Sequence, residues 1–260
     1  MKISSSVASQ QLAQRRGDYG FDAPYVPIIF LCIGLAVIVL GLLLLLWQSL
    51  LLWQSPLWGI VCLLYGMYML LSSASFIYTT RRGKFQVWAE LLVGLNLRGD
   101  EQILDMGCGR GAVLLMAASF LNEGKATGVD IWSTRDQSGN VREVTLKNAE
   151  REGVAKKVEL YTADMRELPF ANDTFDLVLS SLAIHNISQH EGRDKALEEA
   201  VRVLKPRGRL IIADIRVTKR YAEHLRELGM TDVSHQLLDW RFWYGAPWVM
   251  TNLVKASKAS

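Results

Sequence analysis

The sequence predicts an α/β domain with a mostly parallel sheet, preceded by a hairpin of two membrane-spanning helices. Residues 23–80 contain no Asp, Glu, Lys, Arg or His, so this stretch is long and apolar enough for two spans. From residue 85 onward, short apolar runs alternate with helical patterns, which is typical of parallel sheets covered on both faces. A turn of alternating glycines, residues 107–111, follows the first apolar run of this domain.

Composition limits the class of partner and the cellular setting. The 260-residue chain is 50% hydrophobic and carries 29 basic and 26 acidic side chains. This near balance of charge argues against nucleic acid as a partner. Cys32 and Cys62 lie in apolar segments and Cys108 lies in the glycine turn, which suggests neither a disulfide framework nor a metal cluster. We expect an intracellular, reducing setting and no bound metal.

Residues 1–24 are predicted to form a polar N-terminal segment on the cytoplasmic side. The segment is rich in Ser and Gln, and we expect a tail or a short amphipathic helix. Asp18, Tyr19 and Asp22 come just before the apolar stretch, so they could form a lid over a site or a spacer beside the membrane. The spacer is the simpler interpretation, and Tyr19 is kept as a candidate substrate contact.

Residues 25–80 are predicted to form a transmembrane helical hairpin. A break near Gln54-Ser55-Pro56 gives spans at about 26–53 and 57–78, each long enough for the roughly 20 residues that cross a bilayer. Basic residues lie before and after the hairpin and none lies in its turn, so both termini and the following domain are expected to be cytoplasmic. Aromatic residues that suit the membrane interfaces are Tyr25, Trp47, Trp53, Trp58 and Tyr78.

Two pairs of glycines predict how the spans pack. Gly34 and Gly41 are seven residues apart, as are Gly59 and Gly66, so each pair lies on one helix face and permits close helix approach. The contact could lie within the hairpin or between copies of the chain in a homo-oligomer. Packing within the hairpin is the simpler interpretation.

Residues 81–260 are predicted to form the α/β domain. We expect strands at 102–106, 126–130, 158–161, 175–180 and 209–214, and helices at 85–95, 111–122, 139–152, 192–204 and 219–228. Two late strands, near 233–240 and 248–255, have no helix between them and should therefore pair antiparallel.

The glycine turn favours a cationic cofactor over a dinucleotide. Gly107 to Ala112 can be aligned with the dinucleotide-binding pattern, but that match is weak by itself. Asp105 ends the preceding strand, where its charge would repel a pyrophosphate and attract a cation. S-adenosylmethionine has a cationic amino acid end and no phosphate, and we expect it to be the cofactor.

Carboxylates also follow the next two strands. Asp130, nineteen residues after Gly111, is placed to hydrogen-bond ribose hydroxyls. Asp164 follows the third strand and could accept from an adenine amino group, while Met165 could pack on the ring. Carboxyl ends of parallel strands meet at one edge of a sheet, so these residues are expected to form a single site.

In this order the motifs resemble those of class I S-adenosylmethionine-dependent methyltransferases, most closely the UbiE-like, small-molecule type. The resemblance covers roughly residues 85–255 and implies a Rossmann-like, seven-stranded sheet with a reversed final hairpin. The matching stretches are Leu104-Asp105-Met106-Gly107-Cys108-Gly109-Arg110-Gly111, Gly128-Val129-Asp130, Ala163-Asp164-Met165, Phe175-Asp176-Leu177-Val178 and Leu204-Lys205-Pro206-Arg207-Gly208.

The resemblance also implies roles for individual residues. It places the aspartate and glycines of the turn at the methionine end of the cofactor, and Ile131 and Met165 on either side of the adenine. The implied cofactor contacts are Asp105, Gly107, Gly109, Asp130, Ile131, Asp164, Met165 and Ser180. Asp176 is expected to pair structurally, and Arg110 to face solvent.

Candidate residues for the acceptor side are His185, Asn186 and Trp243. His185 follows the fourth strand, where the resembled family places groups that face the acceptor, so it could remove a proton or orient the substrate. A packing role for His185 is equally open. Trp243 belongs to an aromatic cluster at residues 240–248, which could be core, wall an acceptor pocket or touch the bilayer.

These observations predict an integral-membrane methyltransferase that acts, without a metal, on a small-molecule acceptor at the cytoplasmic membrane face. A lipid or quinol and a soluble amine or imidazole are both open as acceptors, and with the latter the hairpin would serve localisation alone. The alternative from another functional class is a membrane sensor or scaffold that binds S-adenosylmethionine without turnover.

Overall fold

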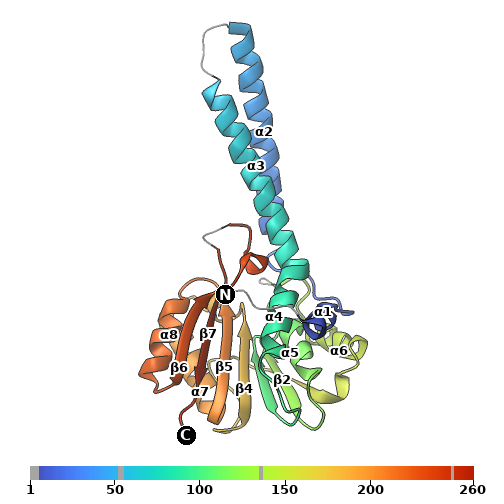
Figure 1. Ribbon diagram of the computed structural model, residues 1–260, viewed down its shortest axis with the longest axis vertical. Coiled ribbons are helices and arrows are strands. Elements are labelled where there is room, and N and C mark those ends of the chain that lie inside the picture. Colours follow the sequence, from blue (N-terminus) through green and yellow to red (C-terminus); the bar gives the residue numbers. More distant parts are fainter. Residues whose placement is uncertain (1–5, 52–55, 135–136, 247–248) are drawn as a thin grey trace.

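The computed structural model describes residues 6–51, 56–134, 137–246 and 249–260. It consists of an α/β domain and a long helical hairpin that rises from one end of the sheet (Figure 1). Trp53, the predicted break at Gln54-Ser55, and Trp248 lie outside the described residues.

Every predicted helix and strand of the α/β domain has a counterpart near its expected range. The helices are α1 (Val7–Ala13), α2 (Tyr25–Leu51), α3 (Leu57–Tyr78), α4 (Lys84–Val93), α5 (Ala112–Ala118), α6 (Arg142–Arg151), α7 (His190–Val203) and α8 (Thr218–Glu227), with a π-helical turn η1 (Thr79–Gly83) and 3-10 turns η2 (Ala155–Lys157), η3 (Ile184–Asn186) and η4 (Trp240–Phe242). The strands are β1 (Gln102–Met106), β2 (Lys125–Asp130), β3 (Val158–Thr162), β4 (Phe175–Ser181), β5 (Leu204–Asp214), β6 (Thr231–Leu237) and β7 (Asn252–Ser257).

The seven strands form one sheet in the order β3-β2-β1-β4-β5-β7-β6. The pairs among β1 to β5 are parallel, whereas β7 is antiparallel to both β5 and β6, which confirms the predicted reversed hairpin. The two strands of this hairpin are shorter on its aromatic side than expected, since β6 ends at Leu237 and β7 begins at Asn252. Asp239 accepts a hydrogen bond from the Arg241 amide at 3.0 Å, and the chain turns there into η4.

Helices cover both faces of the sheet, as the continuous apolar strands predict. Along β5, Ile211 and Ala213 pack in a cluster with side chains of α4, α5 and α6. Leu210 and Ile212 point to the other face and pack with α7 and α8. Because helices cover both faces, a ligand is expected at the loops that follow the carboxyl ends of the parallel strands, where ligands bind in such folds.

Helices α2 and α3 pack against each other, with close contacts at two pairs of glycines. A Cβ atom added to Gly41 would lie 2.9 Å from the Gly59 carbonyl oxygen, and one added to Gly34 would lie 3.1 Å from that of Gly66. The glycines therefore allow close approach within the hairpin, which was the simpler of the two interpretations. Both helices are long and apolar enough to cross a membrane. Their outward, exposed side chains include Ile28, Leu35, Leu42, Leu64 and Leu71.

Helix α3 runs through η1 into α4, so the hairpin and the α/β domain share one continuous helical segment, residues 57–93. The loop between β6 and β7 packs against this segment. The ring of Trp240 stacks on that of Tyr78 with 5.3 Å between centroids, and the Thr79 hydroxyl donates to the Trp243 carbonyl. Arg241 makes a two-pronged ion pair with Glu90 at 2.8 Å for each contact.

Replacing Gly83 with Ala is expected to destabilise this junction. The added Cβ atom would lie 1.7 Å from the Arg241 carbonyl oxygen, so the backbone of the loop must shift. We expect a loss of about 1–3 kcal/mol, typical of overpacking, measured by thermal unfolding in detergent. Gly94→Ala is the matched control, since its Cβ would make only ordinary contacts at 3.4 Å. If both variants unfold at the wild-type temperature, the junction is not tightly packed.

Candidate functional site

The glycine turn connects β1 to α5 and brings β2 beside it. The amides of Gly107 and Cys108 donate to the Val129 carbonyl at 2.8 and 3.1 Å. Gly111 has φ +85° and forms the N-cap of α5, a left-handed conformation that favours glycine. The Gly109 amide donates to Asp130 Oδ2 at 2.8 Å, so two predicted cofactor residues meet directly.

Asp130 is held firmly at the end of β2. Its Oδ1 accepts the Trp132 amide at 2.6 Å and the Asn140 side-chain amide at 3.2 Å. These bonds fix the carboxylate beside the glycine turn. Next to it, Ile131 is 63% exposed. An apolar side chain left open at the carboxyl end of β2 offers a surface on which a planar ring can pack.

Asp105 lies beneath the turn with 1% of its surface exposed. Burial raises the pKa of Asp105 to about 7; the Leu114 amide lowers it and the charge of Asp130 raises it further. Among the described residues, none donates a hydrogen bond to its Oδ1 atom. A buried carboxyl with a free acceptor is suited to a cationic ligand, because the ligand's charge would favour the ionised form.

Of the two predicted residues after β3, Met165 reaches the turn and Asp164 does not. A Cβ atom added to Gly107 would lie 3.1 Å from Met165 Cε and 2.3 Å from Ala183 Cβ, so the loops after β3 and β4 close over this glycine. Asp164 instead pairs with its neighbour Arg166, which lowers the pKa of that carboxyl. In this arrangement the Asp164 carboxylate is engaged by Arg166 and half open to solvent.

Ser180 and Tyr19 are hydrogen-bonded to other parts of the domain. The Ser180 side chain is buried, and its hydroxyl donates to the Met106 carbonyl at 2.9 Å, so it ties β4 to β1. Tyr19 is 7% exposed; its ring packs edge-on against Phe85 and its hydroxyl donates to Glu152 at 2.8 Å. Both side chains serve as anchors within the protein, and the cofactor contact of Ser180 and the substrate contact of Tyr19 stay predictions.

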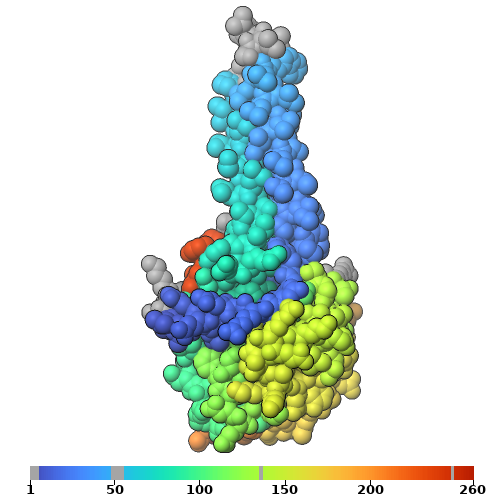
Figure 2. Space-filling model, turned by 90° about the vertical axis from the view of Figure 1, so that its right-hand side faces the viewer, coloured from blue at the N-terminus to red at the C-terminus, as the bar shows by residue number. Residues whose placement is uncertain are grey.

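Residues 15–22, here called the strap, dock on the domain and are not a free spacer. Figure 2 shows the N-terminal segment lying across the domain beneath the hairpin, against the region of α6. Glu152 Oε1 accepts the backbone amides of Arg16 and Gly17 at 2.8 and 2.9 Å, and Oε2 lies 3.3 Å from Arg15 Nη2. This corrects the spacer interpretation, since the first three residues of the strap are bonded to Glu152, the C-cap of α6.

The strap reaches the glycine turn through Arg110 and Gln137. Arg110 is 7% exposed and pairs with Asp18 at 2.7 Å, so it does not face solvent as expected. Gln137 accepts the Arg110 amide through Oε1 at 3.0 Å and donates to the Tyr19 carbonyl and to Asp22. A Cβ atom on Gly109 would lie only 2.6 Å from Gln137 Oε1. The strap and Gln137 together therefore cover the turn.

His185 lies in η3, directly after β4, with 16% of its side chain exposed. Its Nδ1 lies 2.5 Å from Oδ1 of Asp214, a fully buried residue that ends β5. Sequence analysis did not assign Asp214, although it ends a strand with a carboxylate as Asp105 and Asp130 do. Asn186 is exposed beside His185, while the Trp243 indole donates to the Leu238 carbonyl near the base of the hairpin.

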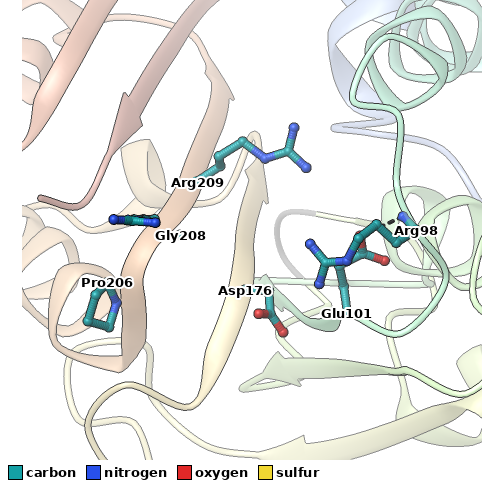
Figure 3. A pocket seen from close by; sticks show the side chains of 7 residues that line it. Arg98, Glu101, Asp176, Pro206, Gly208 and Arg209 are labelled. Atoms are coloured by element: carbon teal, nitrogen blue, oxygen red, sulfur yellow. Dashed lines mark hydrogen bonds between the residues drawn. The ribbon is translucent and has the colours of Figure 1, made fainter. Parts of the chain in front are cut away.

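Asp176 pairs structurally as expected. It accepts the Gln102 amide and the Lys205 ammonium group through Oδ2, at 2.8 and 2.9 Å. It also lines a cavity of about 270 Å³ together with Arg98, Glu101 and Arg209 (Figure 3). This cavity lies at the amino ends of β1 and β4, the edge of the sheet opposite the glycine turn, and its acidic side chains already accept protein donors. It is therefore separate from the candidate site.

Comparison with known proteins agrees with this geometry. A family model described as a methyltransferase domain matches residues 104–212, from β1 to β5. This match supports the predicted methyltransferase domain, and S-adenosylmethionine is the cofactor, in agreement with the sequence prediction.

Relatives of the methyltransferase domain act on different acceptors. A sterol 4-C-methyltransferase of Caenorhabditis elegans is 32% identical over 133 residues, which cover 51% of this chain and 36% of that protein. A ubiquinone/menaquinone biosynthesis C-methyltransferase of Roseobacter denitrificans is 31% identical over 133 residues, 51% of this chain and 50% of that protein. The chain thus spans half or less of the length of these curated relatives.

Solved structures share the fold of the methyltransferase domain. A S-adenosylmethionine-dependent methyltransferase from Aquifex aeolicus superposes with a TM-score of 0.50 at 20% identity, covering 65% of this chain and 88% of that one. The [4+2]-cyclase SpnF gives a TM-score of 0.53 at 20% identity, covering 67% and 82%. At this identity the likeness concerns the fold alone.

Replacing Asp130 with Ala is expected to weaken cofactor binding by about 1–3 kcal/mol, because a ribose hydroxyl would lose its acceptor and the Gly109 amide its partner. Isothermal titration with S-adenosylmethionine measures the change. Asp100→Ala serves as control, since Asp100 is an exposed carboxylate whose side chain pairs with Arg98 away from the turn. Unchanged affinity in Asp130→Ala would contradict the ribose role.

Proposed function

We propose that the protein is a membrane-anchored, S-adenosylmethionine-dependent methyltransferase that methylates a small, lipid-soluble acceptor at the cytoplasmic face of a membrane. The observation that carries this proposal is the position of the hairpin. Its base packs at the same edge of the sheet at which the glycine turn and the ends of the parallel strands lie (Figure 1).

Contacts at this edge join the hairpin to the site. The Trp88 indole of α4 donates to Ser181 at the end of β4, 2.9 Å away. Asp22, just before α2, accepts from Lys84 at 2.6 Å, from the Tyr244 hydroxyl at 2.9 Å and from Gln137 at 3.3 Å. An acceptor dissolved in the bilayer would reach the site without crossing the aqueous phase.

The exposed surface of the hairpin supports the membrane assignment. Large apolar side chains point outward along α2 and α3, and water would make so large a patch unfavourable. Arg81 and Arg82 are exposed where the hairpin meets the domain, which favours the cytoplasmic side for the domain. The named acceptors of the two curated relatives, a sterol and the quinones, are lipid-soluble as well.

Residues at the turn fit the cofactor. Asp105 has a free buried acceptor for its cationic end, Asp130 is fixed beside Gly109 for the ribose, and Ile131 is open for the adenine. When bound, S-adenosylmethionine supplies an electrophilic methyl group. The chain itself must hold the acceptor in line with that group and exclude water, and such positioning is worth up to about 7–11 kcal/mol of the barrier in well-aligned cases.

The full-length protein in lipid nanodiscs, supplied with methyl-labelled S-adenosylmethionine, tests this proposal. Quinols, sterols and phospholipids form one panel of acceptors, and water-soluble amines and imidazoles form another. We expect label in the organic extract. Label found only in aqueous products would assign a soluble acceptor and overturn the lipid-soluble class. Cofactor binding with no transfer to either panel would instead indicate a sensor or scaffold.

A further inference from the structure

We propose that Asp214 is a positioning residue that holds His185 in the tautomer with a free Nε2, and that His185 removes the proton of an acceptor hydroxyl. This inference rests on the proposed function and names the chemistry of its acceptor.

Hydrogen bonds to His185 and Ile215 hold the Asp214 carboxylate in place. Oδ1 lies 2.5 Å from His185 Nδ1 and accepts the Ile215 amide at 2.8 Å, while Oδ2 accepts the His185 amide at 3.1 Å. Asp214 has no exposed surface, so its charge requires these donors. A neutral His185 imidazole can donate a hydrogen bond to Asp214 Oδ1 only if its proton is on Nδ1, and this leaves the Nε2 lone pair free.

The backbone places the imidazole beside the cofactor turn. Strands β4 and β5 pair in register up to Ser181 and Ala213, and the Leu182 amide donates to the Ala213 carbonyl at 2.9 Å. Leu182 has φ +55°, a left-handed conformation that a leucine rarely adopts. Ala183, the next residue, closes over Gly107. Strain of this kind persists where surrounding contacts hold a functional turn.

No described residue hydrogen-bonds to His185 Nε2, and the ring retains an exposed edge. Nε2 is thus open to a ligand that enters beside the glycine turn. A base has a use only when the acceptor must lose a proton before or during transfer. A phenolic or alcoholic hydroxyl has this requirement, and so has a carbon that exchanges its proton for the methyl group, whereas a neutral amine can attack through its own lone pair. We choose a hydroxyl because its proton lies on the attacking atom itself, so one base beside the methyl group can reach it.

The proton balance is as follows. The acceptor hydroxyl gives its proton to Nε2, and its oxygen lone pair forms the new bond to the methyl carbon. The carbon–sulfur bond breaks with its electron pair remaining on sulfur, which leaves a neutral thioether. The imidazolium formed on His185 is stabilised by the adjacent Asp214 carboxylate until its proton passes to water.

Nitrogen-15 NMR of the full-length, histidine-labelled protein tests the positioning role without turnover. We expect the His185 signal, assigned with His185→Gln, to report a proton on Nδ1. Asp214→Asn should move the proton to Nε2, because the new amide can donate to Nδ1. Asp232→Asn, an exposed substitution of the same type, should leave the signal unchanged. Nδ1 unprotonated in the wild type, or an unaltered signal in Asp214→Asn, would overturn the inference.

Transfer kinetics supply the second test. Asp214→Asn and His185→Ala should each lower kcat for hydroxyl acceptors by about 10²-fold or more while cofactor affinity stays within about twofold. Added imidazole should partly rescue His185→Ala, which a purely structural defect would prevent. Wild-type turnover in both variants would overturn the inference while leaving the proposed function intact. Absence of transfer by the wild type to any acceptor would overturn the proposed function, and this inference with it.

Discussion

Replacing Asp105 with Asn should make the cofactor-free protein more stable at pH 8 and should abolish the pH dependence of cofactor binding. Burial raises the pKa of Asp105 to about 7, against 3.8 for an ordinary Asp. Between about pH 4 and pH 7 the folded state therefore holds a proton that the unfolded state has lost, and stability falls as the pH rises. Ionisation of the buried Asp105 costs the folded state about 4 kcal/mol of stability above pH 7. Asn mimics the protonated form of Asp105, so the Asp105→Asn protein would not lose this stability.

Cofactor affinity should change in the opposite direction. A cationic ligand beside Asp105 favours the ionised carboxylate, so wild-type affinity should rise with pH and level off above about pH 7. Calorimetry in buffers of different ionisation enthalpy should detect proton release on binding to the wild type and none with Asp105→Asn. Equal wild-type affinity at pH 6 and pH 8 would show that Asp105 does not sense the bound charge.

Replacing Glu152 with Ala should release the strap. Glu152 accepts two strap amides and the Tyr19 hydroxyl and pairs with Arg15, and both charged side chains are less than 10% exposed. Removing one member of a buried ion pair leaves the other charge uncompensated, which costs about 3–5 kcal/mol. Limited trypsin digestion measures the effect, because Arg15 and Arg16 are cleavage sites that the docked strap protects.

Glu150→Ala is the matched control, since Glu150 lies in the last turn of α6, two residues before the C-cap Glu152, and is exposed. We expect rapid cleavage at Arg15 and Arg16 in Glu152→Ala, and slow cleavage in Glu150→Ala and in the wild type. Equal protection in all three proteins would mean that the strap is held by Asn148 and Arg110 alone.

Local patterns were sufficient to predict the layout of the fold. Buried strands leave continuous apolar runs in the sequence, and the hairpin helices form a long stretch without charged residues. The strands and the hairpin therefore lie close to their predicted ranges. The two late strands were expected at about 233–240 and 248–255, with the aromatic residues between them, but β6 ends at Leu237 and β7 begins at Asn252. In the structure Asp239 and Arg241 turn the segment between these strands into a loop that packs against the hairpin, a tertiary contact that a strand pattern does not encode.

The candidate site residues at the glycine turn were predicted from one rule, that ligand-binding residues follow the carboxyl ends of strands. Asp105, Gly109 and Asp130 follow from that rule, and Asp214 would have followed had the rule been applied to β5. The strap could not be predicted, because Arg15 and Glu152 lie far apart in the chain and each looks like an ordinary surface charge. Arg110 was misjudged for the same reason, since its partner Asp18 belongs to a segment with no pattern of its own.

A structure of the protein in a lipid nanodisc with S-adenosylmethionine bound tests the central claim most directly. We predict that the cofactor lies against the turn at Gly107 and Gly109, that its methyl group faces His185 Nε2, and that the space beyond the methyl group opens toward the base of the hairpin. A methyl group facing a channel that opens away from the hairpin, or a cofactor bound elsewhere on the domain, would contradict the account.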